Sequence, residues 1–559
     1  MKVIIVGGVA GGASAAARLR RLDETAEITM YERSGYISYA NCGLPYYVGG
    51  VITNQSDLTL QTPQSFYNRF RVNVKVLHEV IDINVNDKTI TVKNLASGEI
   101  FTDSYDKLVL STGAKALKPN LKGVDEEGVF TLRTVEDTLK IHNYVKEKNV
   151  KTAVVVGGGF IGLETAENLA RLGISVTIVE AVSQVMGVLD EDMVSQVHAL
   201  IKANGIKLAL GSKIVSLENK KCLLDNESVI DADVILLAMG VVPDTSLING
   251  KLDTGIKGSI IVNEKMETSV KDVYAVGDAV EVKHFITGKP SLISLAGPAN
   301  KQGRIVADNI AGLNSKYDGS MGTSVLKLFD MTIASTGINE KTAKALGYDY
   351  DKVILSPASH AGYYPGGKVM TMKVLFDKSE NKLLGAQIVG FDGVDKRIDV
   401  IATAIKANLK ATDLAELELA YAPPYSSAKD PVNMAGFIIE NVITGKVKQF
   451  YFDDVAKLQK DDDAFLLDTR TPMEYSLGHA DGFTNIPVDE LRERIGELPK
   501  NKTIYVMCQS GLRSYVATRI LQGYGFKAYN FAGGYRFYSM VANEKLTARN
   551  TFSCGMDKK

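Results

Sequence analysis

Cys42 is the residue in this chain whose surroundings most strongly indicate redox chemistry. It lies in the stretch Ser38-Tyr39-Ala40-Asn41-Cys42-Gly43-Leu44-Pro45-Tyr46. The next cysteine is Cys222, so neither a Cys-x-x-Cys nor a Cys-x-x-x-x-Cys pair is present. A lone thiolate can form a mixed disulfide or a persulfide with a sulfur compound brought in from outside. The alternative interpretation is a small buried apolar residue, because free cysteine is often part of a protein core.

A second candidate nucleophile, Cys508, opens the run Cys508-Gln509-Ser510-Gly511-Leu512-Arg513-Ser514, directly after a strand expected over residues 503–507. A loop between a strand and a helix points several backbone amides at one place and forms an anion-binding nest. We expect those amides, the helix dipole and Arg513 to stabilise a Cys508 thiolate, which can carry the outer sulfur of a persulfide. A buried cysteine after a strand is again the alternative.

Two glycine-rich turns stand where each could bind a dinucleotide. The first, Gly7-Gly8-Val9-Ala10-Gly11-Gly12, joins a buried strand at residues 3–6 to an alanine-rich helix, whose first amides can hold a pyrophosphate. Glu32 ends the next strand, where a carboxylate can accept hydrogen bonds from ribose hydroxyls. Val9 replaces the middle glycine of the G-x-G-x-x-G pattern, so a turn that binds nothing stays open as an alternative.

The same pattern returns over residues 153–180. Gly157-Gly158-Gly159-Phe160-Ile161-Gly162 is a complete G-x-G-x-x-G turn, and Glu180 ends the strand that follows. A carboxylate there suits a free 2′-hydroxyl and repels a 2′-phosphate, and no Arg or Lys lies between residues 181 and 190. The sequence therefore favours NADH, with NADPH still possible. Two such units predict two dinucleotides, most simply a flavin and a nicotinamide that exchange hydride.

Two further stretches, Ser111-Thr112-Gly113-Ala114 and residues 273–278, lie where a flavoprotein would contact its flavin. With all these motifs in this order, residues 1 to about 445 resemble the pyridine nucleotide-disulfide oxidoreductase family. The resemblance implies an FAD-binding domain interrupted by an inserted NAD-binding domain, followed by a dimerisation domain. The cofactor contacts predicted on this basis are Gly7, Gly8, Val9, Ala10, Gly11, Gly12, Glu32, Arg33, Thr112, Gly113, Gly157, Gly159, Gly162, Glu180, Gly277 and Asp278.

Within that family, the opening turn and the Cys42 stretch look like the coenzyme A-disulfide reductases and their persulfide-reducing relatives. Ser14, Arg18 and Arg21 share one face of the first helix, where two arginines could hold a phosphate-bearing substrate; a solvated helix face is the alternative. Phe70 is a departure, because relatives carry a lysine near this position. The resemblance implies Cys42 as the nucleophile and the following coenzyme A contacts: Ser14, Arg18, Arg21, Ser38, Asn41 and Lys429.

The resemblance also implies a homodimer with shared active sites, in which Tyr363 and Tyr421 of one subunit reach toward Cys42 of the other. A phenol there can donate a proton to a leaving thiolate. Tyrosines in Pro/Gly-rich loops are as often packing residues, so both interpretations stay open. A thiolate beside an oxidised flavin is stabilised, so we expect a lowered pKa for Cys42.

The C-terminal stretch, with Asp468-Thr469-Arg470, Glu474, His479 and the Cys508 loop, resembles a rhodanese domain. We therefore predict an α/β chain of two Rossmann-like nucleotide-binding domains, an α+β dimerisation domain and an α/β rhodanese domain. Cys222 is expected in the core, and no role is assigned to Cys554. The predicted boundaries are 1–115 and 245–325 for the FAD-binding domain, 116–244 for the NAD-binding domain, 326–445 for dimerisation, 446–460 for a linker, 461–545 for the rhodanese domain and 546–559 for a tail.

Composition limits the remaining classes of function. The chain has 559 residues, a formal net charge of −1, 45% hydrophobic residues and four cysteines. That charge gives no general attraction to nucleic acid or to an anionic membrane. Few cysteines in a long chain fit a reducing compartment, and no apolar run reaches transmembrane length. We therefore expect a cytoplasmic protein without a metal site, nucleic-acid partner or membrane partner.

These observations predict a flavin-dependent NAD(P)H reductase of coenzyme A persulfide, coenzyme A disulfide or polysulfide, fused to a sulfur-transferring domain. Cys42 would accept electrons, and Cys508 with Arg513 would carry sulfur. One alternative is an NADH peroxidase or oxidase that uses Cys42 as a sulfenic acid. Another is a redox-sensing flavoprotein. The sequence does not rank the three substrates.

Overall fold

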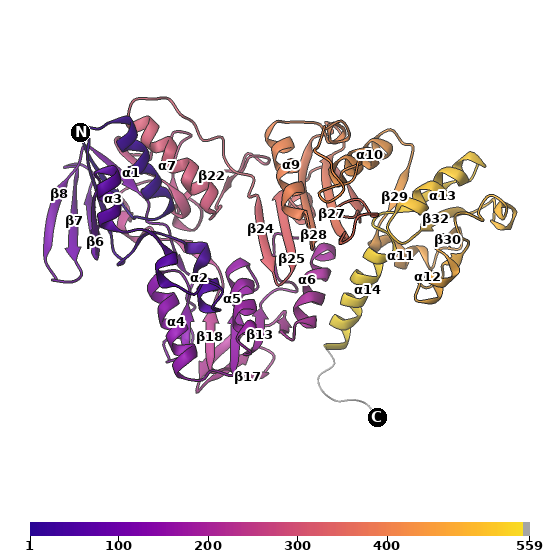
Figure 1. Cartoon of the computed structure of the whole chain (residues 1–559), viewed down its shortest axis with the longest axis horizontal. Coiled ribbons are helices and arrows are strands. Elements are labelled where there is room, and N and C mark those ends of the chain that lie inside the picture. Colours follow the sequence, from indigo (N-terminus) through magenta and orange to yellow (C-terminus); the bar gives the residue numbers. More distant parts are fainter. Residues whose placement is uncertain (552–559) are drawn as a thin grey trace. The chain divides into compact units, whose positions relative to one another are not determined.

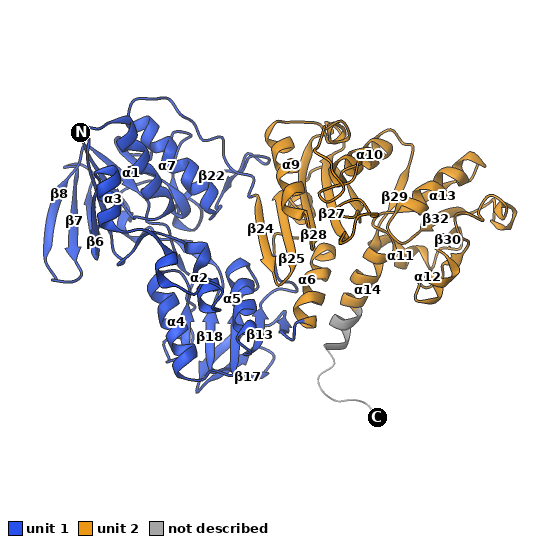
Figure 2. Cartoon of the chain, in the orientation of Figure 1, with its two compact units in different colours: residues 1–186, 204–322 blue, residues 187–203, 323–559 orange. Residues whose placement is uncertain are grey.

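The computed structural model describes residues 1–551, with side chains through Lys545; Cys554 lies outside the described residues. The chain folds into two compact units (Figure 2). The first unit holds residues 1–186 and 204–322, and the second holds residues 187–203 and 323–559. Over the described residues, every helix is too short or too polar to cross a membrane.

The first unit contains two parallel five-stranded sheets, each built around a strand that leads into a glycine turn. Their strands are runs of Val, Ile and Leu, as expected where both faces of a sheet are covered. In the first sheet the order is β21 (Val273–Ala275), β9 (Lys107–Leu110), β1 (Lys2–Val6), β2 (Glu27–Glu32), β5 (Asn73–Val76). In the second sheet the order is β11 (Val129–Thr131), β18 (Val234–Leu237), β12 (Thr152–Val156), β13 (Ser175–Glu180), β14 (Lys207–Leu210).

Helices cover these sheets and begin at the glycine turns. Helix α1 (Ala10–Leu22) follows β1 and packs against α7 (Ala296–Ile310), as Figure 1 shows. Their contact is close because Gly303 has no side chain: a Cβ there would lie 2.3 Å from the Gly11 carbonyl oxygen. In the second sheet, α5 (Phe160–Arg171) follows β12 as α1 follows β1, and α4 (Val135–Glu147) follows β11. Three antiparallel strands accompany each sheet: β6 (His78–Asn84), β7 (Thr89–Asn94) and β8 (Ile100–Ser104), and β15 (Ile214–Glu218), β16 (Lys221–Leu224) and β17 (Val229–Asp231).

The two turns need glycine for steric reasons at matching positions. Gly7 and Gly157 have φ values of +100° and +109°, which side chains rarely adopt. A Cβ at Gly12 would lie 1.9 Å from the Gly7 carbonyl oxygen, and the same holds for Gly162 and Gly157. Val9 has φ −104°, so no backbone strain forbids a side chain at the position that departs from the pattern.

The second unit contains an antiparallel sheet and a parallel sheet. The antiparallel order is β24 (Ser324–Leu328), β25 (Met331–Gly337), β28 (Leu383–Gly390), β27 (Met370–Asp377), β26 (Tyr350–Leu355). Helices α6 (Glu191–Ala203), α8 (Glu340–Ala345), α9 (Val394–Lys406) and α10 (Pro431–Ile443) belong to the same unit. The sequence did not anticipate that α6, which falls within the predicted NAD-binding segment, clusters with this sheet.

A buried lysine holds the start of α6 to the antiparallel sheet. Lys373 is fully buried in β27, and its Nζ lies 3.0 Å from Asp190 and 2.9 Å from Asp192. It also pairs with Glu340, which binds Lys352 at 2.6 Å. The carboxylates of Asp190, Asp192 and Glu340 converge within 4.8 Å, so an ammonium group occupies the place where such a cluster could hold a metal ion.

The parallel sheet of the second unit has the order β29 (Lys448–Phe450), β33 (Ala528–Phe531), β32 (Thr503–Met507), β30 (Ala464–Asp468), β31 (Thr484–Asn485). Its helices are α11 (Phe452–Leu458), α12 (Pro472–Ser476), α13 (Leu512–Gly523) and α14 (Gly534–Thr551). The segment 446–460, expected to be a linker, instead contains β29 and α11. Strand β29 pairs with β33, so this segment belongs to the parallel sheet.

Helix α14 extends from the parallel sheet to α6 (Figure 1). Glu544 on α14 accepts a hydrogen bond at 2.9 Å from Nδ1 of His198, which is 2% exposed, and pairs with Lys202 at 3.2 Å. A second hydrogen bond joins the C-terminal segment to the antiparallel sheet. The hydroxyl of Tyr451, just before α11, donates to Asp351 of β26 at 2.7 Å.

Candidate functional site

The two acidic residues predicted to bind ribose lie beside their glycine turns in the same way. Glu32 Oε2 accepts a hydrogen bond from the Gly8 amide at 2.8 Å, and Glu180 Oε2 accepts one from the Gly158 amide at 2.7 Å. Each carboxylate is therefore held at the carboxyl end of its sheet, next to the turn. This is the edge at which parallel sheets bind nucleotides.

Two of the predicted cofactor contacts, Thr112 and Gly159, have features that a bound cofactor would use. The Thr112 hydroxyl is buried without a hydrogen-bond partner in the described structure, although a buried hydroxyl normally has one. At the second turn, a Cβ on Gly159 would meet no atom within 4 Å. An unsatisfied donor at one turn and open space at the other fit the FAD and the nicotinamide dinucleotide that the sequence predicts.

Two of the predicted contacts are engaged in ion pairs that the sequence did not indicate. Asp278 pairs with Arg133 at 2.5 Å, and Arg33 pairs with Asp244 at 2.8 Å. Arg133 also donates to the carbonyl of Ala114, so it joins the two stretches expected beside the flavin. No local pattern marks Arg133, because its carboxylate partner lies 145 residues away.

Cys42 is exposed and lies in a short 3₁₀ turn, Asn41–Gly43, between β3 (Ile37–Tyr39) and α2 (Leu44–Val48). Ser38 has the positive φ of +45° and donates its amide to the Gly8 carbonyl at 2.8 Å. That bond fixes the Cys42 segment to the first glycine turn. An external sulfur compound can therefore reach the thiol while the turn stays in place.

The protein groups around Cys42 favour its thiol form. Partial burial of the sulfur raises the pKa of Cys42, the Glu164 carboxylate raises it further, and Arg133 opposes both. The expected lowering is therefore not produced by the chain's own residues. Burial also raises the pKa of Glu164, to about 7, and the Tyr46 hydroxyl donates to this carboxylate at 3.2 Å. Glu164 was missed, although it lies two residues after Gly162 on the helix that the second turn begins.

The predicted coenzyme A face of α1 lies beside α7. Ser14 hydrogen-bonds Asn300, and Arg18 pairs with Asp308 at 2.8 Å, while Arg21 is exposed. Arg18 is thus committed to a carboxylate of its own chain, and Arg21 is the more available of the two cations. Exposed Asn300 is an added candidate, which the sequence reading missed because it lies 286 residues from Ser14.

Tyr363 and Tyr421 come together in the second unit. Their hydroxyls lie 2.6 Å apart, and the two side chains are 76% and 46% exposed. High exposure argues against packing residues within this chain. Lys429 is also exposed, eight positions after Tyr421. The structure describes a single chain, so the expected reach of these residues to the other subunit stays a prediction.

Cys508 lies at the carboxyl end of β32 with its sulfur inside a small hydrogen-bonded loop. The Gly511 amide donates to its Sγ at 3.1 Å, and the Ser514 hydroxyl donates at 3.2 Å. From the start of α14, the Tyr535 amide donates to the Cys508 carbonyl at 2.7 Å. One backbone amide and one hydroxyl thus point at the sulfur, and the nest of several amides stays a prediction.

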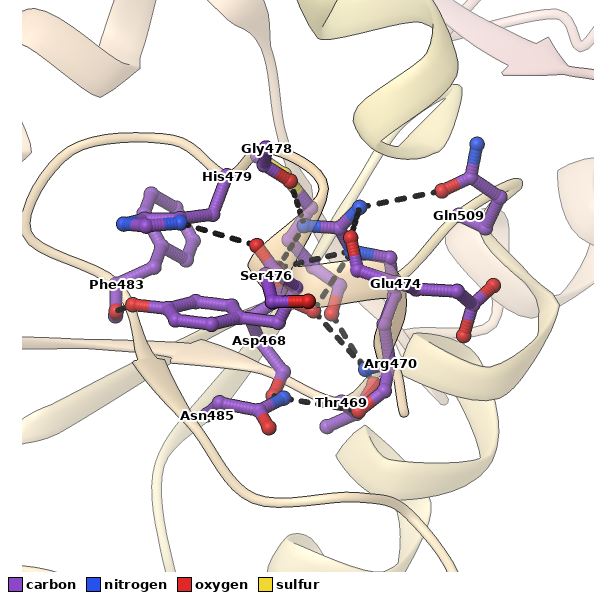
Figure 3. A network of polar contacts seen from close by, with 12 residues as sticks. Asp468, Thr469, Arg470, Glu474, Ser476, Gly478, His479, Phe483, Asn485 and Gln509 are labelled. Atoms are coloured by element: carbon purple, nitrogen blue, oxygen red, sulfur yellow. Dashed lines mark hydrogen bonds and ion pairs between the residues drawn. The ribbon is translucent and has the colours of Figure 1, made fainter. Parts of the chain in front are cut away.

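Arg470 organises the neighbouring segment of the same domain (Figure 3). Its buried guanidinium binds both carboxylate oxygens of Asp468, donates to the Gly478 carbonyl at 2.8 Å and reaches Gln509 of the Cys508 loop. Figure 3 shows Glu474 on the adjoining α12 segment. Glu474 pairs with Arg513 through two bonds of 2.7 Å, so the predicted catalytic arginine has a carboxylate partner.

The fold and the site define a flavin-type oxidoreductase with a single reachable thiol, fused to a second domain that has a thiol of its own. The chain belongs to the pyridine nucleotide-disulphide oxidoreductase family, whose sequence pattern matches residues 1–303. The dimerisation domain of that family matches residues 323–431, and a rhodanese-like domain matches residues 452–540. Membership implies FAD and NAD(P)H as cofactors.

Named relatives cover between 78% and 97% of the chain. Coenzyme A disulfide reductase of Staphylococcus haemolyticus is 40% identical over 440 residues, which are 78% of this chain and 98% of that protein. The crystal structure of reduced Bacillus anthracis CoADR-RHD is 49% identical with a TM-score of 0.95, covering 97% of this chain and 98% of the other. A NAD-dependent persulfide reductase from A. fulgidus is 36% identical with a TM-score of 0.91, covering 96% and 100%.

Proposed function

We propose that this protein is an NADH-dependent reductase of coenzyme A persulfide or coenzyme A disulfide that acts through Cys42. The observation that carries the proposal is the exposed Cys42, anchored by Ser38 to the first glycine turn. The names of the relatives at 36–49% identity support sulfur substrates of this class. FAD, when bound, supplies the passage of two electrons from NADH to the sulfur site.

In this reaction the residues of the chain would have separate roles in binding, attack and proton donation. Arg21, with Ser14 and Asn300 beside it, offers charge and hydrogen bonds to the phosphates of a coenzyme A species. Cys42 attacks the disulfide or persulfide, and a thiol or sulfide leaves. In this proposal, Tyr363 and Tyr421 of the partner subunit would donate the proton that the leaving sulfur requires.

The rhodanese domain would supply or accept sulfane sulfur through Cys508. Its Sγ already receives hydrogen bonds from Gly511 and Ser514, which would stabilise the negative charge of a bound persulfide. The presence of this domain favours persulfides over a plain disulfide as the working substrate. It also disfavours a peroxidase or oxidase, which has no use for a sulfur carrier.

Anaerobic NADH consumption tests the proposal, with coenzyme A persulfide, coenzyme A disulfide, polysulfide and hydrogen peroxide as separate substrates. Steady turnover is expected with the coenzyme A species. C42S should abolish it, while FAD stays bound and sulfur transfer at Cys508 survives. C508A should lose transfer and keep the reduction of small substrates. Full persulfide reduction by C42S, or turnover only with peroxide, would overturn the proposal.

A homodimer is part of the same proposal, because a shared site needs tyrosines from a second copy. Sedimentation at assay concentration should give twice the chain mass. Mixing C42S with Y363F protein should restore activity, since one of the two sites in a mixed dimer would be intact. An active monomer would contradict this arrangement.

A further inference from the structure

The Cys508 loop carries one cationic residue, and that residue is fully paired. Between Cys508 and Ser514 the only Lys or Arg is Arg513. Its NH1 donates to Glu474 Oε2 and its NH2 to Glu474 Oε1, both at 2.7 Å. Both side chains are 33% exposed, so the pair lies at the surface of the site rather than in the core. This bidentate geometry is the strongest that a guanidinium and a carboxylate form.

The neighbouring guanidinium is paired in the same way. Arg470, which contacts Gln509 of the loop, is bound by both oxygens of Asp468. Arg470 is 1% exposed, so a sulfur donor that approaches Cys508 meets Arg513, and this arginine is already neutralised by Glu474. A dianion with its charge next to the reacting sulfur, such as thiosulfate, gains little from this surface and meets the Glu474 carboxylate at close range.

The flanks of the pair suit a different kind of donor. Met473 and Leu512, the chain neighbours of Glu474 and Arg513, are 74% and 68% exposed. Exposed large apolar side chains beside a site favour a ligand with an apolar body. The persulfide of an organic thiol has such a body, and any phosphates it carries lie far from its sulfur.

We propose that Glu474 is a specificity-determining residue of the sulfur-transfer site, which selects organic persulfides against thiosulfate by neutralising Arg513. The inference rests on the proposed role of Cys508 as a sulfur carrier. In the favoured reaction the Cys508 thiolate attacks the outer sulfur of R–S–SH. A bond forms between Sγ and that sulfur, the donor S–S bond breaks, and its electron pair and the proton leave as RSH. With thiosulfate the same attack would release sulfite.

E474Q tests the assignment, because it keeps the shape of the side chain and removes its charge. The measurement is kcat/KM for thiosulfate and for glutathione persulfide, with cyanide as acceptor, full-length protein and no NADH. We expect the ratio of thiosulfate to persulfide to rise about tenfold, which equals about 1.4 kcal/mol. The rise should come mainly from a lower KM for thiosulfate. It should shrink with added salt, because salt screens a freed surface cation. An unchanged ratio overturns the proposal.

Two further variants separate this charge effect from others. E497Q removes an equally bidentate pair, Arg494 with Glu497, elsewhere on the domain and should leave the ratio as it is. In E474Q/R513Q the gain should vanish, because no cation is freed; a persisting gain overturns the proposal. C508A should abolish both transfers; transfer that survives contradicts the proposed function of Cys508 instead.

The wild-type protein gives a test that does not depend on the folding of any variant. With Arg513 neutralised, kcat/KM for thiosulfate should not fall as salt is raised. A steep fall with salt would reveal a free cation at the site and overturn the assignment of Glu474.

Discussion

Tyr363 and Tyr421 share a hydrogen bond of 2.6 Å between their hydroxyls, although 58 residues separate them. This bond raises the pKa of Tyr363. A phenol with a raised pKa stays protonated near neutral pH. The pair can act as one donor, with one hydroxyl oriented by the other.

We therefore expect Y363F and Y421F each to lower kcat with coenzyme A persulfide about 100-fold, as for other removed general acids. The double variant should be no slower than the worse single variant, because the two hydroxyls act as a unit. Steady-state kinetics measure this, and Y364F serves as control. If the double variant lost kcat by the product of the two single losses, the two hydroxyls would be working separately.

Glu180 should set the choice of nicotinamide cofactor. Its carboxylate is held beside the second turn by the Gly158 amide, where a 2′-phosphate would meet a like charge. E180Q keeps an acceptor for that amide and removes the charge. The ratio of kcat/KM for NADPH to that for NADH should rise about tenfold, or about 1.4 kcal/mol. E218Q, a surface change in the same unit, should not alter it, and a wild-type preference for NADPH would contradict the argument.

Glu164 should depress the reactivity of Cys42. The pKa of Glu164 is about 7, so at about pH 8 its charge opposes ionisation of the thiol. E164Q should therefore lower the pKa of Cys42 and speed its alkylation by iodoacetamide severalfold at that pH. A C508A/C554S background leaves Cys222, which is fully buried, as the other cysteine. At about pH 6 the two proteins should differ less, because Glu164 is then mostly protonated; equal rates at about pH 8 would refute the coupling.

Lys373 should be essential for the stability of the second unit. K373M would leave Asp190, Asp192 and Glu340 close together without their central cation, a loss expected to cost about 3–5 kcal/mol. K378M removes an exposed pair with Asp349 and should cost less than about 1 kcal/mol. Denaturant unfolding followed by circular dichroism measures both. If K373M and K378M lost the same free energy of unfolding, burial of this cluster would give no special stabilisation.

The pH dependence of this cluster has a definite sign. Neighbouring lysines lower the pKa of Glu340 from its ordinary 4.5 to about 2. A lowered pKa stabilises the folded protein above about pH 4.5, and the benefit disappears as pH falls toward 2. In K373M the crowded carboxylates should bind protons more readily, so the stability gap to the wild type should narrow on acidification.

The sequence predicted the features that depend on residues close together in the chain. Both glycine turns, their following helices and the acids Glu32 and Glu180 lie as expected, because a positive φ and a close backbone approach leave few alternatives to glycine. The rhodanese-like domain was recognisable for the same reason, since its loop from Cys508 to Ser514 is continuous in the chain.

Partners distant in sequence were not predictable. Arg133 with Asp278 and Glu474 with Arg513 are joined by tertiary folding, and neither pair has a periodic signal. The polar run at residues 460–463 resembled the end of a linker, yet β29 lies before it. A strand of three residues with one buried side chain carries too little pattern to be recognised.

Helix α14 couples the C-terminal domain to helix α6. Its first amides hold the Cys508 loop, and Glu544 farther along covers His198 of α6. A gene shortened to lose the sulfur-carrying domain would uncover a histidine that is now 2% exposed and would strip α6 of its acidic partner. The stability of α6 therefore depends on the C-terminal domain, through the contacts of Glu544 with His198 and Lys202.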